Sequence, residues 1–307
     1  MAISSIISDS NEKKLHIKMP KVCNYDCSYC FQNKIKGIYS SDFFSMHKMS
    51  VINNIIDEFG ITFLFLVGGE PTLFNIDSLL RDVNYSIKKI MITTNFSKSE
   101  QYFLRLNELA EQKNIELRLY CSLHDEFVDY KQFVDKINLV HDYGINHLVL
   151  EFVVGVSNKS RCLDIINYFT EKLNPSISYV VDYDFTNTDI REFYIENSLW
   201  KYSSHRNYYT ITNEPSGTQK LSRQQLRLVK LPSKKYCMTD LKLLENNDLY
   251  SCYRKLLSGN DLKKGKDIFQ NLDLFVCEKK ACRFCHDPHI FTAPAEFRSD
   301  IVRWTNM

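Results

Sequence analysis

Between residue 13 and about residue 184, the chain alternates short apolar runs with longer amphipathic stretches. The apolar runs are rich in Val, Ile, Phe and Tyr, which predicts β-strands. We expect strands at residues 15–19, 61–67, 88–94, 115–121, 147–154 and 178–183. Helical spacing is found at 99–113 and 129–144, where Gly144 is a typical stop signal. Strands and helices in alternation predict an α/β fold, with a parallel sheet that is closed or partly closed into a barrel.

The predicted strand around residue 120 has one apolar and one polar face. The apolar face should lie under the helices, and it carries Ile115, Leu117, Leu119, Cys121 and Leu123. The other face carries Glu116, Arg118, Tyr120, Ser122 and His124. The same alternation places His16 with Lys18, and His147 with Glu151, on two other strands. Packed barrels prefer branched apolar residues inside, so this polar lining predicts a cavity.

Length and charge limit the classes of function. A chain of 307 residues can bury one large core with a smaller annex. The 39 basic residues nearly balance the 37 acidic ones, which argues against an extended nucleic-acid interface. We find no apolar run of bilayer length and no signal peptide, so we expect a cytoplasmic protein without membrane partners. Ten cysteines in a reducing compartment favour metal ligands over disulfides.

Three of these cysteines, Cys23, Cys27 and Cys30, share one short segment, KVCNYDCSYCFQ. Three thiols can hold three irons of a 4Fe-4S cube and leave the fourth iron open for a small molecule. A zinc knuckle or a disulfide pair is the alternative. Tyr29 before the last cysteine, and the lack of a nearby fourth Cys or His ligand in the sequence, favour the iron-sulfur interpretation.

The predicted strand 61–67 is followed by Gly68, Gly69, Glu70 and Pro71. The glycines permit a tight turn and a close approach of backbone to a ligand, and Glu70 supplies a carboxylate. A purely structural turn is the alternative. Parallel barrels carry their sites at the carboxyl ends of strands, where this segment is expected to lie.

Together, CNYDCSYC and the following GGEP resemble the radical S-adenosylmethionine (SAM) superfamily over residues 13–184. The resemblance implies a partial (β/α)6 barrel in which Cys23, Cys27 and Cys30 hold a 4Fe-4S cluster. The open iron would bind the amino and carboxylate groups of SAM. The backbone at Gly68 and Gly69, together with the Glu70 carboxylate, would meet the methionine ammonium.

The resemblance also implies roles for polar residues near other strand ends. Tyr29 would lie against the adenine, although a core role is the alternative. Asn95 would lie near the ribose, but Phe96 follows it where the family often has Gly.

Ser122 and His124 fit polar positions of the family on the next strand, and the alternative for His124 is an edge histidine bonded to a loop carbonyl. Glu151 would bind cofactor or substrate, or form an ion pair with Lys18 or Arg118.

The second cysteine group lies near the C-terminus and resembles the Twitch or SPASM extension of these enzymes. A full SPASM pattern has seven cysteines, whereas five are present here, so we expect one auxiliary 4Fe-4S cluster. A zinc ribbon is the alternative. The favoured ligands are Cys237, Cys252, Cys282 and Cys285, with Cys277 as a replacement. Cys121 is expected in the core, and Cys162 at the start of a helix.

These interpretations predict an N-terminal extension (1–12), a radical SAM partial barrel (13–184), a bridge (185–234) and an iron-sulfur domain (235–307). The expected enzyme cleaves SAM reductively and abstracts a substrate hydrogen, with electrons from a donor such as flavodoxin or ferredoxin. A peptide is the favoured substrate, modified by crosslinking, epimerisation or oxidation. The alternatives are a dehydrogenase or epimerase acting on a sugar, aminocyclitol or other small polyol, and a zinc-binding module without catalysis.

Overall fold

The computed structural model describes residues 2–7, 13–30, 41–184, 187–203, 208–214, 217–222, 235–236, 241–243, 247–252, 255–256 and 276–277. The chain divides into two compact units. One comprises residues 18–53 and 64–205, and we call it the sheet unit. The other comprises residues 1–17, 54–63 and 206–307. Within the described part of the chain, no helix is both long and apolar enough to cross a membrane.

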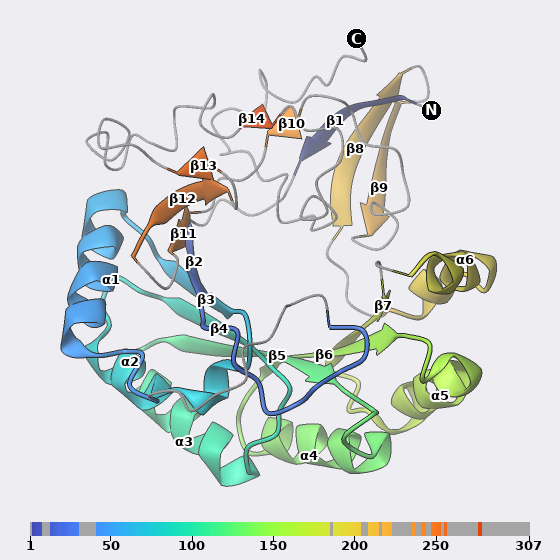
Figure 1. Ribbon diagram of the computed structural model, residues 1–307, viewed down its shortest axis with the longest axis horizontal. Helices are drawn as coiled ribbons and strands as arrows, with labels where there is room; N and C mark the ends of the chain where they lie inside the picture. Colours follow the sequence, from blue (N-terminus) through green and yellow to red (C-terminus); the bar gives the residue numbers. More distant parts are fainter. Residues whose placement is uncertain are drawn as a thin grey trace. The chain divides into compact units, whose positions relative to one another are not determined.

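The central element is an open sheet in which six parallel strands follow one another in chain order (Figure 1). The strands are β2 (Lys14–Lys18), β3 (Phe63–Val67), β4 (Lys89–Thr94), β5 (Glu116–Leu123), β6 (His147–Val154) and β7 (Ser178–Tyr183). Each begins and ends within two residues of its predicted bounds, because each apolar run marks a buried strand. The predicted partial parallel barrel is therefore confirmed.

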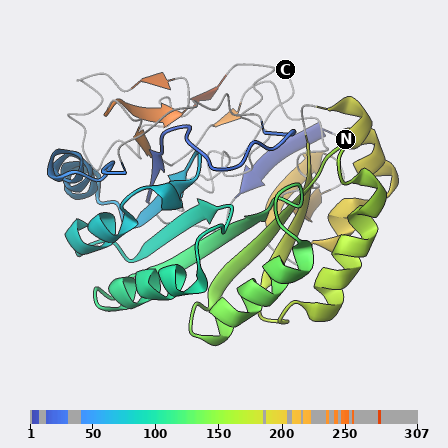
Figure 2. The same cartoon turned by 60° about the horizontal axis from the view of Figure 1, so that its bottom comes forward.

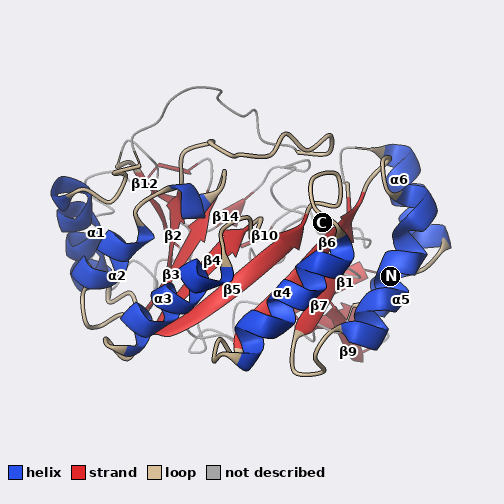
Figure 3. Ribbon diagram, turned by 90° about the horizontal axis from the view of Figure 1, so that it is seen from below, coloured by secondary structure: helices blue, strands red, loops and turns tan. Residues whose placement is uncertain are grey.

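Helices cover one face of the parallel sheet, as Figures 2 and 3 show for α2 to α5. The helices are α1 (Met46–Phe59), α2 (Ile76–Asp82), α3 (Glu100–Glu111), α4 (Tyr130–Asp142), α5 (Cys162–Lys172) and α6 (Thr188–Glu196). Within the described residues, short 3₁₀ helices are η1 (Pro71–Leu73), η2 (Lys159–Arg161) and η3 (Leu199–Tyr202).

The helix α4 illustrates how the sequence forms this layer. Its N-cap residue, Asp129, accepts hydrogen bonds from the backbone nitrogens of Lys131 and Gln132. Its apolar residues recur at helical spacing and are buried, and they are Phe133, Val134, Ile137 and Val140. Gly144 follows the helix with a φ of 116°, which confirms it as the stop.

The predicted faces of β5 are partly confirmed. Leu117, Leu119, Cys121 and Leu123 are buried, as expected for the face under the helices. Tyr120 and Ser122 on the other face are buried as well. Cys121 is thus a core residue, and Cys162 begins α5 as predicted.

The other unit contains strands that the hydrophobic pattern did not predict. β1 (Ala2–Ile7), β8 (Tyr208–Glu214) and β9 (Gly217–Ser222) form an antiparallel sheet. β10 (Lys235–Tyr236) pairs with β14 (Val276–Cys277), and β11 (Leu241–Leu243) pairs with both β2 and β12 (Leu249–Cys252), with β13 (Lys255–Leu256) beyond β12. The domain boundaries expected from the sequence stay a prediction.

Candidate functional site

The turn after β3 packs directly on the backbone that leads to the first cysteine. Gly68 and Gly69 have φ values of 109° and 24°. A Cβ atom on Gly69 would lie 2.2 Å from the carbonyl oxygen of Val22 and 2.3 Å from that of Pro20, so no side chain fits there. The backbone nitrogen of Glu70 donates to the Val22 oxygen at 2.6 Å. The two motifs found in the sequence are therefore in contact.

The Glu70 carboxylate is buried and forms hydrogen bonds with protein donors. Its Oε1 accepts from the Thr72 nitrogen at 3.0 Å, the Thr72 hydroxyl at 2.6 Å and the Thr94 hydroxyl at 2.7 Å. Its Oε2 accepts from the backbone nitrogen of Asn95 at 2.6 Å. Burial raises the pKa of Glu70, and these hydrogen bonds oppose the rise because they favour the charged form. Oε2 is the oxygen with spare acceptor capacity.

Asn95 connects this carboxylate to the cysteine segment. Its Nδ2 donates to Asn24 Oδ1 at 2.8 Å and to the Cys23 sulfur at 3.6 Å. Since its backbone nitrogen binds Glu70, the single residue bridges both motifs. The end of β4 therefore belongs to the same polar network as the turn after β3.

Phe96 follows Asn95 in a left-handed conformation, with a φ of 58°. Such a conformation is strained for a bulky residue, which explains why glycine suits this position. Here the strain is offset by packing, because the buried ring stacks on Phe103 with centroids 4.3 Å apart. Lys136 also donates to the Phe96 carbonyl at 2.8 Å, and burial lowers the pKa of this lysine. The fold therefore accommodates Phe96 at a position where the family often has Gly.

The three thiols Cys23, Cys27 and Cys30 are free of disulfides. A second anchor holds their segment on the side of β5, where Glu126 accepts hydrogen bonds from the backbone nitrogen and the hydroxyl of Ser28. The Ser157 hydroxyl donates to the same carboxylate at 2.7 Å. The cysteine segment is thus fixed both to the turn after β3 and to the loops after β5 and β6.

His124 lies immediately after β5 and faces the middle cysteine. Its Nδ1 is 3.0 Å from the Cys27 sulfur and 3.0 Å from the Tyr29 hydroxyl. The Tyr29 and His124 rings are parallel, with centroids 6.0 Å apart. The Tyr29 ring also packs on Gly155, where an added Cβ atom would lie 3.1 Å from the ring. Burial raises the pKa of Tyr29, which keeps its phenol protonated.

Ser122 and Glu151 lie opposite each other on β5 and β6. The Ser122 hydroxyl donates to Glu151 Oε2 at 3.1 Å, and the Tyr120 hydroxyl donates to Oε1 at 3.3 Å. Arg118 pairs with Glu116 at 2.5 Å. The structure brings the two predicted cofactor residues together, while the ion pair expected between Glu151 and Lys18 or Arg118 stays a prediction.

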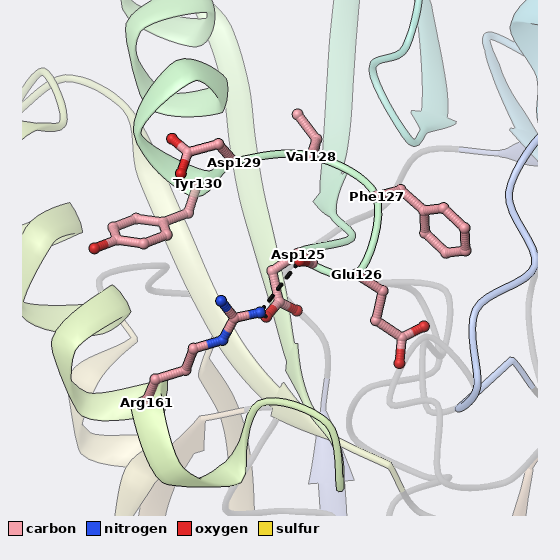
Figure 4. A pocket seen from close by; sticks show the side chains of 7 residues that line it. All are labelled: Asp125, Glu126, Phe127, Val128, Asp129, Tyr130 and Arg161. Carbon is pink, nitrogen blue, oxygen red and sulfur yellow. Dashed lines mark hydrogen bonds and ion pairs between the residues drawn. The ribbon is translucent and has the colours of Figure 1, made fainter.

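A polar pocket of about 280 Å³, which sequence reasoning missed, lies beyond the end of β5 (Figure 4). The carboxylate of Asp125 is buried there, and it pairs with Arg161 at 2.7 Å and accepts from Asn158 at 2.8 Å. The lining residues are Asp125, Glu126, Phe127, Val128, Asp129, Tyr130 and Arg161. The available signal was the pair of acidic residues, Asp125 and Glu126, a few positions after the predicted strand 115–121.

The donor set of the cysteine segment fits a 4Fe-4S cube, since three thiols on one loop, none of them in a disulfide, can each bind a separate iron. Within the described ranges, no three His, Cys, Asp or Glu side chains are arranged around a single metal ion. A cube does not need that arrangement, because its ligands bind different irons. Of the predicted auxiliary ligands, Cys237, Cys282 and Cys285 lie outside the described residues, and Cys252 and Cys277 end the short strands β12 and β14.

The family model of the Radical SAM superfamily matches residues 17–169. This segment, which contains the thiols, the glycine turn and the strands from β3 to β6, is therefore a radical SAM domain. The match and the relatives described next indicate an enzyme.

The chain is similar to proteins named as probable GTP 3',8-cyclases. That of Metallosphaera sedula is 26% identical over 170 residues, which cover 51% of this chain and 51% of the relative. That of Sulfolobus acidocaldarius is 32% identical over 173 residues, which cover 50% and 51%. The chain spans about half the length of the curated relatives it matches.

Among solved structures, the chain resembles Streptococcus suis SuiB bound to precursor peptide SuiA, with a TM-score of 0.51 and 16% identity. The match covers 89% of this chain and 66% of that chain. At this identity the likeness supports the fold alone.

Proposed function

We propose that this chain is a radical SAM enzyme that reductively cleaves SAM and abstracts a hydrogen atom from its substrate. One observation carries the proposal: the segment of Cys23, Cys27 and Cys30 is hydrogen-bonded to the glycine turn through the Glu70 nitrogen and to the side chain of Asn95. This contact joins the two motifs at the carboxyl ends of neighbouring parallel strands, where α/β folds place their sites.

Within this proposal, Cys23, Cys27 and Cys30 hold three irons of the cluster. When bound, cluster and SAM supply a one-electron cleavage that yields a 5'-deoxyadenosyl radical. The chain contributes position and shielding. The anchors at Val22 and Ser28 hold the thiol segment in place, and the buried Glu70 network fixes the glycine turn beside it.

The positions of the other predicted SAM-binding residues support the contacts proposed for them. The backbone of Gly68 and Gly69 meets the methionine ammonium, and Glu70 contributes through Oε2, since Oε1 already accepts three hydrogen bonds. Asn95 is the proposed ribose contact, which is supported by its hydrogen bonds to Glu70 and to the Cys23 sulfur.

Tyr29 is the proposed adenine contact, and its packing against Gly155 and His124 supports this role. Ser122 on β5 and Glu151 on β6 are hydrogen-bonded to each other, one and two strands beyond β4, the strand that precedes Asn95.

The proposed substrate is a peptide, which the enzyme modifies by a crosslink, epimerisation or oxidation. The SuiB structure contains a precursor peptide, so the shared fold is compatible with this substrate class. The names of the curated relatives favour a second candidate, GTP. An auxiliary 4Fe-4S cluster, a flavodoxin or ferredoxin donor and a cytoplasmic location complete the proposal.

The first test replaces one thiol. We expect Cys27→Ala to abolish dithionite-dependent formation of 5'-deoxyadenosine, because the cluster loses one of three ligands. Cys121→Ala is the matched control, since Cys121 is a buried core thiol, and its turnover should stay largely intact. The measurement is 5'-deoxyadenosine by chromatography on anaerobically reconstituted proteins. Unchanged turnover in Cys27→Ala would contradict the assignment.

The second test separates the substrates. GTP and a precursor peptide encoded by a neighbouring gene are added in parallel, and substrate-dependent 5'-deoxyadenosine and modified product are measured by mass spectrometry. Product from the peptide supports a maturase, whereas cyclised nucleotide supports the second candidate and removes the first.

A further inference from the structure

The imidazole of His124 lies within hydrogen-bond distance of a proposed cluster ligand. Its Nδ1 is 3.0 Å from the sulfur of Cys27, which is buried. The donors that reach Cys23 are farther away, with the backbone nitrogen of Tyr25 at 3.4 Å and the Asn95 amide at 3.6 Å. Among these contacts, the one to Cys27 is the shortest, and it comes from a side chain that can be replaced without changing the backbone.

We propose that His124 is a positioning residue that donates its Nδ1 hydrogen to the Cys27 sulfur and thereby raises the reduction potential of the cluster. The proposal rests on the proposed function, because it assumes that Cys27 binds iron. Hydrogen bonds to ligand sulfur withdraw charge from the cluster and favour its reduced form. Residues beyond the ligands commonly tune metal sites in this way.

The chemistry of the partners decides the direction of the hydrogen bond. A thiolate that binds iron has no hydrogen to give and can only accept. The contact at 3.0 Å is therefore attractive only when Nδ1 carries the hydrogen. The Tyr29 hydroxyl oxygen lies at the same distance and then accepts a share of the same hydrogen.

The imidazole is held in this orientation from several sides. It stacks against Tyr29 and meets the edge of Tyr25, whose ring lies parallel to Phe127. The backbone is fixed by a turn in which the nitrogens of Phe127 and Val128 donate to the His124 carbonyl. Because the ring is packed and its backbone is fixed, little side-chain entropy remains to be lost when the hydrogen bond forms.

The test compares His124→Asn with His124→Leu. Asn can place an N–H donor near the position of Nδ1, whereas Leu fills similar space without a donor. After anaerobic reconstitution, iron and sulfide per chain are measured first. The midpoint potential of the cluster is then determined by redox titration monitored by electron paramagnetic resonance, without SAM. His147→Leu, at the exposed start of β6, is the matched control.

We expect His124→Leu to have a more negative midpoint potential than the wild type, His124→Asn to lie closer to the wild type, and His147→Leu to match it. Loss of iron in His124→Leu alone, with retention in His124→Asn, also supports a donor that secures Cys27. Equal potentials in all variants, or equal loss of iron in both His124 variants, overturns the proposal. A wild type that assembles no 4Fe-4S signal would instead defeat the proposed function itself.

Discussion

The two ends of the parallel sheet in the sheet unit use similar residues in different ways. At the carboxyl end, Glu70 is buried and is held by hydroxyl and backbone donors. At the amino end, Glu116 is partly exposed and pairs with Arg118 and His147. The first carboxylate belongs to a network that shapes a site, whereas the second belongs to an ordinary surface ion pair. Burial and the type of partner, not the residue itself, distinguish the two.

The pKa directions of the two carboxylates express this contrast. Burial raises the pKa of Glu70 above its ordinary value despite four hydrogen bonds. Burial also acts to raise the pKa of Glu116, but the hydrogen bond and charge of Arg118 outweigh it and lower the pKa. The carboxyl end of the sheet therefore tolerates a costly buried charge, as sites often do.

The largest effect is expected from an added methyl group at the glycine turn. Gly69→Ala would force a Cβ atom to 2.2 Å from the Val22 carbonyl, so the turn or the cysteine segment must move. We expect a loss of more than about 3 kcal/mol in the free energy of unfolding, beyond the usual range for one substitution. Urea denaturation of the metal-free protein measures it.

Gly144→Ala, near the amino end of β6, is the matched control for this substitution. Gly144 also has a positive φ of 116°, but its nearest neighbour would be 3.9 Å from the added atom. Only backbone strain remains, at about 1–2 kcal/mol. If both variants lose the same stability, close packing at the carboxyl end is not what requires Gly69.

A smaller effect is expected from Glu70→Gln. The amide group would face hydroxyl and backbone donors, and an unsatisfied buried donor costs about 1–3 kcal/mol. We expect the free energy of unfolding, measured by urea denaturation at pH 7, to fall by about 2 kcal/mol. Glu116→Gln at the other end should change stability by less than about 0.5 kcal/mol, as for exposed ion pairs. Equal losses would remove the distinction between the two ends.

The smallest effect is the pH dependence of stability, and its sign differs between the carboxylates at the two ends of the sheet. The lowered pKa of Glu116 gives stability that is present above the ordinary value of 4.5 and is lost as pH falls through the folded value. The raised pKa of Glu70 gives the opposite slope, because stability falls as pH rises from 4.5 through the folded value.

Urea denaturation between pH 3 and about pH 7 checks both signs. The stability difference between wild type and Glu116→Gln should shrink as pH falls, while that for Glu70→Gln should widen. If the stability difference from wild type changed with pH in the same direction for both variants, the environments of the two carboxylates would not differ as described.

The strands and the two motifs of the site were predictable from sequence because their signals are local. Apolar runs mark β3 to β7, and the thiols and glycines each lie within a few residues. The contact between Cys27 and His124 spans 97 residues, and no local pattern contains it. The same holds for the Asp125–Arg161 pair and for the pairing of β1 with β8, which depend on how distant segments meet.

The anchoring of the cysteine segment affects how iron would be taken up. Val22 is bound by the turn after β3 and Ser28 by the loop after β5, so chain entropy is lost during folding, before any metal arrives. Assembly of the cluster would then order few additional residues. A binding loop already held in shape retains more of its intrinsic affinity for metal than one that must fold around it.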